Sequence, residues 1–335
     1  MKFAALERIS LIIVTWNGDD VLSRCLESIL RVYDKMPETI VVDNANREST
    51  RELVARYTNV RYLPLPENLG FAGGNNAALS FCTKDYLVLL NNDTELTADS
   101  ISPLIEFLDA HPACAAVQGK VIFRANGNLD GCGGFFSRLG ILSFRGAFVP
   151  DCDEFKVEER VFTIGGAFFA TRRRVVDELG ALFYDHFRSY YEEIDYCCRL
   201  GLAGYECWYV PTPGVLHHHS VTAAKIGWRK IRRQYYRNIW FSTLTCFGWY
   251  GRIRLLVPIA ALSATQALLA LLKGDTEPLR AHSAAVREMF VLRKLISETS
   301  HRVRKTRRLS DRAFLSFAIR SCPWRYYLRL ARTGS

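Results

Sequence analysis

Short apolar runs alternate with helical patterns through the first 120 residues. Four of these runs have the length and composition of buried strands: Ile9–Val14, Thr39–Val42, Val60–Leu63 and Tyr86–Leu90. Between the first two, apolar residues from Leu22 to Tyr33 recur three and four positions apart, as on the buried face of a helix. We expect Asp19 or Asp20 to cap the start of this helix. Strands that alternate with helices in this way predict βα units around a largely parallel sheet.

Polar residues follow the predicted strands, at the point where each strand ends. They are Thr15, Trp16, Asn17, Asp43, Asn44 and Asn91–Asp93. In an open α/β sheet, ligands bind beyond the carboxyl ends of the strands, so we expect these side chains to line a binding site. The first strand-to-helix turn reads Thr-Trp-Asn-Gly rather than Gly-x-Gly-x-x-Gly. This difference argues against a dinucleotide site and leaves a single nucleotide as a candidate ligand.

Residues 119–170 lose the helical period and gain glycines and aromatic residues. This composition predicts hairpins and loops that line a cleft. Gly165 and Gly166 stand just before an apolar strand, where the lack of a side chain allows a ligand to approach closely. Ordinary turn glycines explain the same pair equally well.

The last third of the chain is strongly basic. Residues 225–335 carry 23 lysines and arginines against 5 acidic residues, in a chain whose net charge is +10. The uncharged run 255–272 reaches the lower length limit for crossing a bilayer, but it contains Pro258, Ser263, Thr265 and Gln266. We therefore predict a basic, helical C-terminal region over 225–335 whose apolar run lies in or against a membrane surface.

A cluster of cations at 301–308 raises the question of nucleic-acid binding. The cluster lies near the apolar run and near Trp324, Tyr326 and Tyr327, which fits anionic lipid headgroups better. We expect an anionic membrane surface as a partner and no nucleic acid.

The ten cysteines form no Cys-x-x-Cys pair, and several fall in apolar helix or strand patterns. Such thiols pack as small hydrophobic groups, as expected of reduced cysteines in a cytosolic protein. The first residues lack the long apolar core of a signal peptide. We therefore expect a cytoplasmic protein that is peripheral on the inner face of the cell membrane.

Six segments share their order and spacing with a known family. They are Ile12–Asn17, Val41–Asn44, Glu67–Asn76, Leu89–Thr94, Tyr191–Asp195 and His217–Ser220. Together they resemble glycosyltransferase family 2, in particular its bacterial and archaeal rhamnosyltransferase-like branch, over roughly residues 8–245. The resemblance implies a GT-A fold, which is a Rossmann-like α/β fold with a mostly parallel central sheet flanked by helices. A catalytic domain would then span 1–224, with a nucleotide-sugar half at about 1–118 and an acceptor half at about 119–224.

The resemblance also implies nucleotide-sugar-binding roles for nine residues. They are Thr15, Trp16, Asn17, Asp43, Asn68, Gly70, Asn75, Asn91 and Asn92. Asp43 matches the carboxylate that bonds the base or ribose, and a carboxylate at a strand end can accept from a pyrimidine N–H or a sugar hydroxyl. The alternative is that Asp43 is a turn residue beside Asn44.

Asn91-Asn92-Asp93 stands where the family carries its Asp-x-Asp metal motif, with Asn in place of the first aspartate. The resemblance implies that Asp93 binds Mg²⁺ or Mn²⁺ and that His217 completes the site. His217, His218 and His219 are consecutive, and because their side chains diverge they cannot all reach one ion. Alternatively, Asn91–Asp93 form a turn that caps the following helix, and the three histidines are solvated.

In Glu192-Glu193-Ile194-Asp195 the family reads Glu-Asp-x-Asp, and its second acid is taken as the catalytic base. That position is Glu193, which is one methylene longer than aspartate, and Glu192 stays as the alternative base. Asp195 and Arg199 are four apart on the predicted helix, so we expect a supporting ion pair.

The sequence thus predicts an inverting, metal-dependent glycosyltransferase. It would move rhamnose or another hexose from a dTDP- or UDP-sugar to a lipid-linked or polysaccharide acceptor, as a monomer or an oligomer. One alternative is a sugar nucleotidyltransferase, although Thr15–Gly18 lacks the basic, glycine-rich phosphate loop of that class. The other is a catalytically silent membrane-docking subunit. Against it, the acidic positions of the motifs carry acidic residues rather than apolar replacements.

Overall fold

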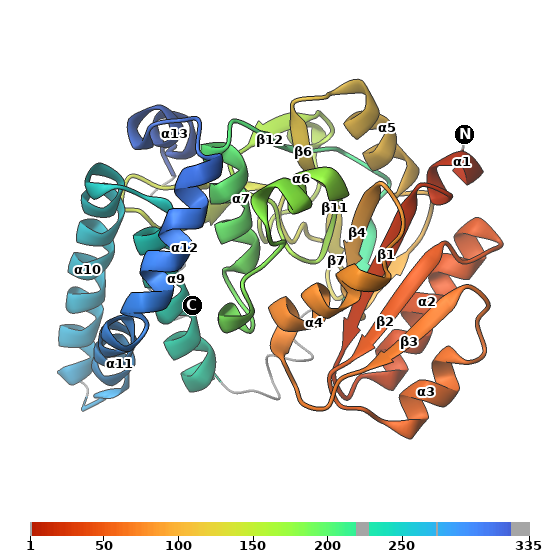
Figure 1. Cartoon of the computed structure of the whole chain (residues 1–335), viewed down its shortest axis with the longest axis horizontal. Coiled ribbons are helices and arrows are strands. Elements are labelled where there is room, and N and C mark those ends of the chain that lie inside the picture. Colours follow the sequence, from red (N-terminus) through yellow and green to blue (C-terminus); the bar gives the residue numbers. More distant parts are fainter. Residues whose placement is uncertain (1, 219–227, 273, 323–335) are drawn as a thin grey trace.

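The computed structural model describes residues 2–218, 228–272 and 274–322, and it is built around one eight-stranded sheet (Figure 1). The strands lie in the order β10-β12-β6-β11-β4-β1-β2-β3. Their bounds are β1 (Ile9–Thr15), β2 (Glu38–Asp43), β3 (Val60–Pro64), β4 (Tyr86–Leu90), β6 (Cys114–Gln118), β10 (Glu159–Val161), β11 (Phe168–Arg172) and β12 (Glu206–Tyr209). β10 and β11 run opposite to the other six. The predicted strands and their mostly parallel arrangement are confirmed.

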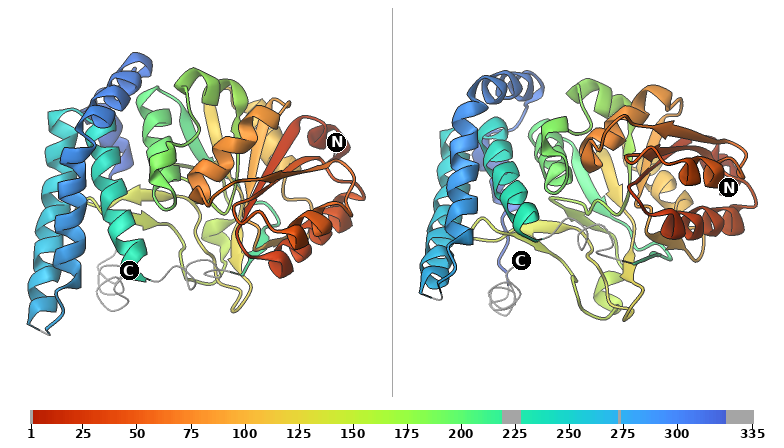
Figure 2. Two further views of the ribbon diagram at one scale, coloured as in Figure 1. Left: turned by 60° about the horizontal axis from the view of Figure 1, so that its bottom comes forward. Right: turned by 90° about the horizontal axis from the view of Figure 1, so that it is seen from below.

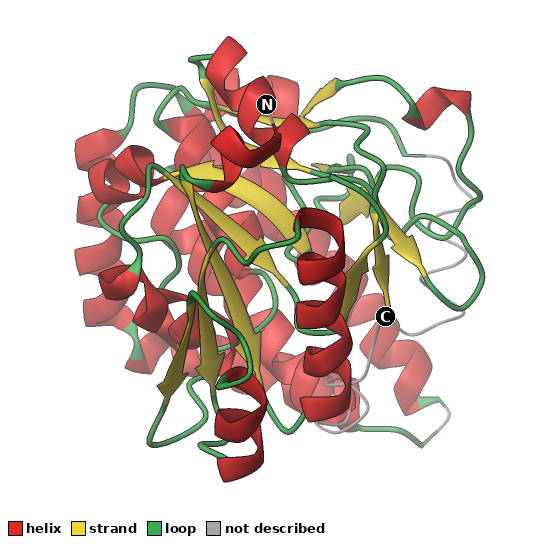
Figure 3. Cartoon of the chain, turned by 90° about the vertical axis from the view of Figure 1, so that its right-hand side faces the viewer, coloured by secondary structure: helices red, strands yellow, loops and turns green. Residues whose placement is uncertain are grey.

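Helices flank the sheet on both of its faces (Figure 3). They are α1 (Lys2–Leu6), α2 (Asp19–Tyr33), α3 (Glu48–Val54), α4 (Gly70–Ala78), α5 (Ser102–Ala110), α6 (Arg173–Leu179) and α7 (Glu192–Leu202), with short 3₁₀ turns η1 (Leu79–Phe81), η2 (Asp153–Phe155) and η3 (Asp185–Phe187). The helix predicted after β1 is α2, but its cap differs from the prediction. Gly18 is the N-cap, and the Asp19 carboxylate instead accepts hydrogen bonds from Ser49 and Thr50, which ties α2 to α3.

Alternate residues of the central strands face opposite hydrophobic clusters. In β4, Leu87 and Leu89 belong to one cluster, whereas Val88 and Leu90 belong to the other. The second cluster is covered by α2 and α5, and the first extends through α7 into the C-terminal helices. Burial on both faces explains why these strands read as continuous apolar runs rather than as an alternation.

Two smaller sheets accompany the central sheet. One has the order β5-β13-β7, with bounds β5 (Thr94–Leu96), β7 (Val121–Phe123) and β13 (Val215–His217). The other pairs β8 (Gly134–Phe136) with β9 (Leu142–Phe144). The predicted hairpins and loops of residues 119–170 are thus present, and β5-β13-β7 brings chain segments about a hundred residues apart into one ladder.

The C-terminal helices form a layer against one end of the sheet (Figures 1 and 2). They are α9 (Trp228–Cys246), α10 (Trp249–Leu271), α11 (Glu277–Val291), α12 (Arg293–Thr306) and α13 (Asp311–Ala318). Phe241, Leu255, Val303 and Phe314 from this layer share the cluster that contains Leu89 of β4. The basic region is therefore helical over the residues described, as predicted, and it packs on the same core as the central sheet.

The apolar run 255–272 falls within α10 and the residue that follows it. In the described ranges, no helix combines the length and the hydropathy needed to cross a bilayer. One face of α10 is exposed and apolar, with Trp249, Ile253, Val257 and Leu268 between 57% and 76% exposed. Trp324, Tyr326 and Tyr327, which we associated with lipid headgroups, lie outside the described residues, as does His219.

Candidate active site

A cavity of about 660 Å³ opens at the carboxyl ends of β1, β4 and β6. It lies where the sheet topology predicts a ligand site, and ten of the thirteen site residues expected from the sequence line it. They are Thr15, Trp16, Asn68, Gly70, Asn91, Asn92, Asp93, Glu192, Glu193 and His217. Asn44, Gly165 and Gly166, which the sequence also singled out, line the same cavity.

Three expected residues do not line the cavity. Asn17 is exposed in the turn after β1, and Asn75 is buried, with its amide donating to the Phe71 carbonyl at 2.8 Å. The fully buried Asp43 carboxylate accepts from the backbone N–H groups of Ala45 and Arg47, both at 2.8 Å. It also accepts from the Tyr62 hydroxyl. In this arrangement Asp43 closes the turn after β2, the alternative that the Asp-Asn sequence left open.

At the floor of the cavity, polar contacts join the end of β4 to the end of β1 and to the residue before β11. The Asn92 amide donates to Thr15 Oγ1 at 3.0 Å, and the Asn91 N–H donates to the Ala167 carbonyl at 2.9 Å. A Cβ at Gly18 would lie 2.8 Å from the Asn92 amide nitrogen, which is too close. These contacts fix the loop that presents Asp93.

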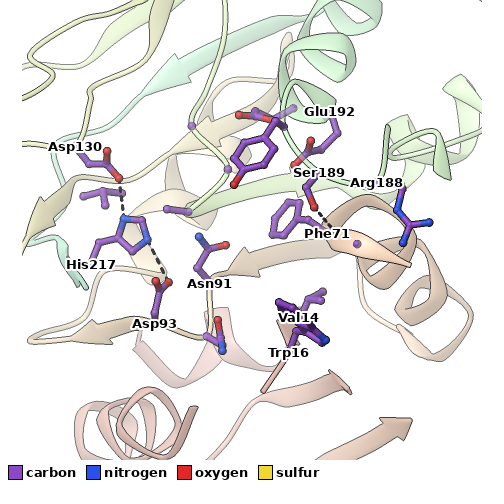
Figure 4. A pocket seen from close by; sticks show the side chains of 18 of the residues that line it. Val14, Trp16, Phe71, Asn91, Asp93, Asp130, Arg188, Ser189, Glu192 and His217 are labelled. Atoms are coloured by element: carbon purple, nitrogen blue, oxygen red, sulfur yellow. Dashed lines mark hydrogen bonds and ion pairs between the residues drawn. The ribbon is translucent and has the colours of Figure 1, made fainter. Parts of the chain in front are cut away.

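His217 lies between two carboxylates (Figure 4). Its Nε2 is 3.2 Å from Asp93 Oδ1, and its Nδ1 is 2.8 Å from Asp130 Oδ2. The register of the small sheet produces this contact, because β13 pairs with β5 so that His217 stands opposite Thr94, the residue after Asp93. Asp130 is placed by its own N–H, which donates to the Val121 carbonyl at the start of β7.

The two carboxylates control the charge of this histidine. Burial disfavours the imidazolium, but the hydrogen bonds and charges of Asp130 and Asp93 outweigh it and raise the pKa of His217 to about 9. Burial also opposes ionisation of Asp93, yet the hydrogen bond and charge of His217 lower its pKa below the usual value. The Asp93 carboxylate is therefore ionised at neutral pH.

The donor set of this cluster fits a divalent cation in part. Asp93 offers a carboxylate oxygen on the cavity wall, which Mn²⁺ and Mg²⁺ accept in proteins. His217 would offer Nε2 to an ion only after that nitrogen loses its proton, because the raised pKa keeps the ring protonated near neutral pH. Asp130 bonds the opposite ring nitrogen, which is the usual support of a histidine ligand. No group of three or more His, Cys, Asp or Glu side chains in the described residues is arranged to hold an ion. A cation held by these two side chains would need further ligands, which oxygens of a diphosphate could supply.

Glu192 and Glu193 open α7 on another wall of the cavity, and Figure 4 shows Glu192 across from Asp93. Within the described structure, the Oε2 atom of each glutamate is buried and has no hydrogen-bond partner. Burial raises the pKa of Glu193 to about 7. Burial and the neighbouring Glu193 charge raise the pKa of Glu192 well above its usual range. Both carboxyls therefore hold their protons more tightly than an exposed glutamate does.

The expected ion pair on α7 is confirmed. Arg199 Nε lies 2.8 Å from Asp195 Oδ2, and both side chains are almost completely buried. Arg199 also donates to the carbonyls of Ala181 and Leu182. Asp195 therefore supports the helix that carries the glutamates and does not reach the cavity.

Three functional candidates escaped the sequence analysis. Asp130, Arg188 and Gln234 line the cavity, but none belongs to a motif whose spacing we could interpret. Arg188 arrives on the loop before α7, and its carbonyl lies against Gly70, where an added Cβ would clash with it. The glycine at position 70 was the local sequence signal of a close approach, and its φ of +76° is one that glycine adopts readily.

The family model described as glycosyl transferase family 2 matches residues 10–180. An N-acetylglucosaminyl-diphospho-decaprenol L-rhamnosyltransferase of Mycobacterium tuberculosis is 26% identical over 231 residues, which are 62% of this chain and 75% of that protein. A poly-beta-1,6-N-acetyl-D-glucosamine synthase of Staphylococcus aureus is 24% identical over 209 residues, 62% of this chain and 48% of that protein. These relatives agree with the resemblance that the six sequence segments indicated.

Two solved structures share the fold. A mannosyltransferase from Pyrobaculum calidifontis in complex with GDP-Man and Mn²⁺ is similar over 89% of this chain and 85% of that chain, with a TM-score of 0.52 and 17% identity. GalNAc-T7 with UDP, GalNAc and Mn²⁺ is similar over 70% of this chain and 47% of that chain, with a TM-score of 0.53 and 17% identity. The predicted GT-A fold is thereby confirmed, and the chain belongs to glycosyltransferase family 2.

Proposed function

We propose that this glycosyltransferase is inverting and metal-dependent, and that it uses a nucleoside diphosphate sugar. One observation supports this above all: a single cavity holds Asp93 and His217 on one wall and, on another, two glutamates that each have a buried, unpartnered Oε2 atom. The first pair suits a metal diphosphate, and the second suits an attacking hydroxyl. The family membership disfavours the sugar nucleotidyltransferase alternative.

On the donor side, Asp93 and His217 would hold Mg²⁺ or Mn²⁺. The ion supplies positive charge that stabilises the departing diphosphate. Thr15, Asn91 and Asn92 form the floor on which the nucleotide would lie. Asn68 and Gly70 border the same space from the start of α4. Asp130 keeps the His217 ring oriented through its hydrogen bond to Nδ1.

On the acceptor side, we assign the base to Glu193. The acceptor oxygen forms a bond to the anomeric carbon while the bond from that carbon to the diphosphate oxygen breaks. The electron pair leaves with the nucleoside diphosphate, and the hydroxyl proton passes to Glu193. A pKa of about 7 suits this task because the carboxylate is available at neutral pH and still basic enough to accept a proton. Burial and the Glu193 charge raise the pKa of Glu192 well above its usual range, which favours its neutral form.

For the substrates, we propose a dTDP- or UDP-linked rhamnose or other hexose and a lipid-linked or polysaccharide acceptor in cell-surface polysaccharide synthesis. The support is the similarity to the mycobacterial rhamnosyltransferase and to the staphylococcal polysaccharide synthase. The test is a donor screen with the full chain. dTDP-rhamnose, UDP-hexoses and GDP-mannose are each added with Mn²⁺ or Mg²⁺, and thermal shift and nucleoside diphosphate release are measured. Metal-dependent release from one donor supports the proposal, and equal release in EDTA contradicts it.

We also propose that the enzyme sits on the cytoplasmic face of the cell membrane through α10. The exposed residues Trp249, Ile253 and Val257 are four apart and so share one helix face, and cations abound in the same region. Ile253→Ser with Val257→Ser should weaken binding to anionic liposomes by at least about tenfold, because each side chain loses its burial in lipid. Leu30→Ser, which alters an exposed leucine on α2, is the matched control and should bind like the wild type. Unchanged binding of the double variant would contradict this docking face.

A further inference from the structure

The loop that leads into α7 has an unusual backbone. Arg188, Tyr190 and Tyr191 all have positive φ, at 59°, 68° and 77°, although none is glycine. Side chains disfavour this conformation, at a cost on the order of 1 kcal/mol or more for each residue, so other contacts must maintain it. Glu192 follows directly, and any movement of this loop moves both glutamates.

Helix α9 supplies hydrogen-bond donors to the carbonyls of this loop. The Asn238 Nδ2 group lies 3.0, 3.1 and 2.6 Å from the carbonyl oxygens of Phe187, Ser189 and Tyr190. Asn238 is completely buried. Its amide oxygen, Oδ1, accepts a hydrogen bond from Arg237 Nε at 3.0 Å. This bond fixes the orientation of the amide, so that its N–H groups point toward the loop.

Two neighbours on α9 add to this contact. Gln234 Nε2 donates to the carbonyls of Phe187 and Ser189 at 2.9 and 2.6 Å. Arg237 Nη2 donates to the carbonyls of His186 and Phe187 at 2.5 and 3.0 Å. The charge of Arg237 strengthens its bonds. Helix α9 therefore supplies donors to four carbonyls of this loop, those of His186, Phe187, Ser189 and Tyr190.

The other side of the loop is bonded to the wall of the cavity. The Ala72 N–H donates to the Arg188 carbonyl at 2.8 Å, and the Phe71 N–H donates to Ser189 Oγ at 3.2 Å (Figure 4). Arg188 Nη2 donates to the Asn68 carbonyl at 2.6 Å. The loop is thus held between the start of α4 and helix α9.

We infer that Asn238 is a positioning residue for the catalytic base, with Gln234 and Arg237 in support. Asn238 does not line the cavity, and it acts by holding the loop that sets where α7 begins. This inference rests on the proposed role of Glu193. It gives the C-terminal region a part in the chemistry besides membrane docking, because α9 fixes the geometry of the glutamates. A displacement of about 1 Å at a reacting group can lower a rate by on the order of 10²-fold.

The test compares the full-length wild type with Asn238→Ala and with Thr245→Ala. Thr245 is a matched control, because it is also a buried polar residue of α9 but bonds carbonyls of its own helix. The assay follows metal-dependent hydrolysis of dTDP-rhamnose, or of the donor chosen by the screen, with water as acceptor. We expect Asn238→Ala to lower kcat by on the order of 10- to 10²-fold while the donor KM changes by less than about threefold. Thr245→Ala should keep both constants.

A double-mutant cycle separates positioning from general destabilisation. If Asn238 acts through Glu193, then Asn238→Ala should cost little further rate in a Glu193→Gln background. Full multiplication of the two losses would overturn the inference. If Glu193→Gln alone keeps wild-type activity, the proposed base is wrong. That result is distinguishable from a failure of the Asn238 inference, which is measured by the effect of Asn238→Ala on kcat.

Hydrogen exchange keeps the test decisive if Asn238→Ala lowers stability. Amides of residues 186–191 should exchange faster in Asn238→Ala and, to a smaller degree, in Gln234→Ala, while those of β1 and β4 stay protected. Gln234 is only partly buried, so its truncation should leave the fold intact. Exchange that rises equally across the sheet and the loop, together with wild-type kcat for Gln234→Ala, would contradict the positioning role.

Discussion

Two parts of this cavity are built in different ways. We call them the donor wall, which is Thr15, Asn91–Asp93 and His217, and the base loop, which is residues 186–191 before the glutamates of α7. The donor wall consists of strand ends, where Thr15 and Asn92 are brought together by neighbouring parallel strands. The base loop has a strained backbone, and its carbonyls are bonded by Asn238 and Gln234 from a helix about fifty residues later in the chain. In the proposed mechanism, metal and donor binding would depend on the strand ends, whereas proton transfer would also depend on the C-terminal layer.

The largest effect should come from the base. Glu193→Gln removes the proton acceptor but keeps its size, so transfer should fall by on the order of 10²- to 10⁴-fold. Because the raised pKa of about 7 belongs to the group that must be ionised, the wild-type rate should rise with pH through about 7. The residual rate of Glu193→Gln should lack that rise.

The control for the base is the adjacent acid. Glu192→Gln should retain more activity and the same pH profile, because it leaves the proposed base in place. The raised pKa of Glu192 also favours the neutral form that the amide mimics. If Glu192→Gln is instead the inactive variant and Glu193→Gln works normally, the base is Glu192. Rates measured from pH 5.5 to 8.5 at saturating metal distinguish the two assignments.

A smaller effect should come from the support of His217. Asp130→Asn removes the carboxylate on Nδ1, and loss of such a partner commonly weakens metal affinity by about 10- to 100-fold. We expect a higher Mn²⁺ concentration for half-maximal activity, with kcat at saturating Mn²⁺ changed less. Glu95→Gln is the matched control, since Glu95 bonds the next histidine, His218, outside the cavity. Equal metal affinity in wild type and Asp130→Asn would exclude the supporting role.

The smallest effect should be on stability. The folded-state pKa of Glu193 lies above its ordinary value of 4.5, so the folded protein holds this proton more tightly than the unfolded chain does. This contribution is present at low pH and is lost as pH rises from about 4.5 to 7. The melting temperature of Glu193→Gln should therefore exceed that of the wild type at pH 8, and the difference should be smaller at pH 5. An equal difference at the two pH values would show that burial does not shift this carboxyl.

The sequence predicted the donor wall well because its signals are local. An apolar run followed by Asn91-Asn92-Asp93 specifies both a buried strand and the polar residues at its end, and the sheet topology then brings several such ends together. The prediction for Asp43 was less secure, because its local signal fits two different structures. An Asp-Asn pair after a strand suits a ligand or a turn, and only the three internal hydrogen bonds favour the turn.

Neither the base loop nor the contact of Asp130 with His217 could be predicted in this way. Asp130 meets His217 through the register of β13 with β7, and Asn238 meets the loop through the packing of α9 on α7, neither of which follows from residue spacing. The positive φ values of Tyr190 and Tyr191 also had no sequence signal, because these residue types usually avoid that conformation. Long-range contacts determine this part of the site.

The most direct test is to measure donor binding in variants of the two walls. Isothermal titration calorimetry with the nucleoside diphosphate of the preferred donor and Mn²⁺ compares the wild type with Asp93→Ala and Glu193→Gln. We predict that Asp93→Ala loses Mn²⁺-dependent binding, because Asp93 supplies the carboxylate on this wall, and that Glu193→Gln binds like the wild type but does not transfer. Mn²⁺-dependent binding that survives in Asp93→Ala and disappears in Glu193→Gln would contradict the division of the site into a donor wall and a base loop.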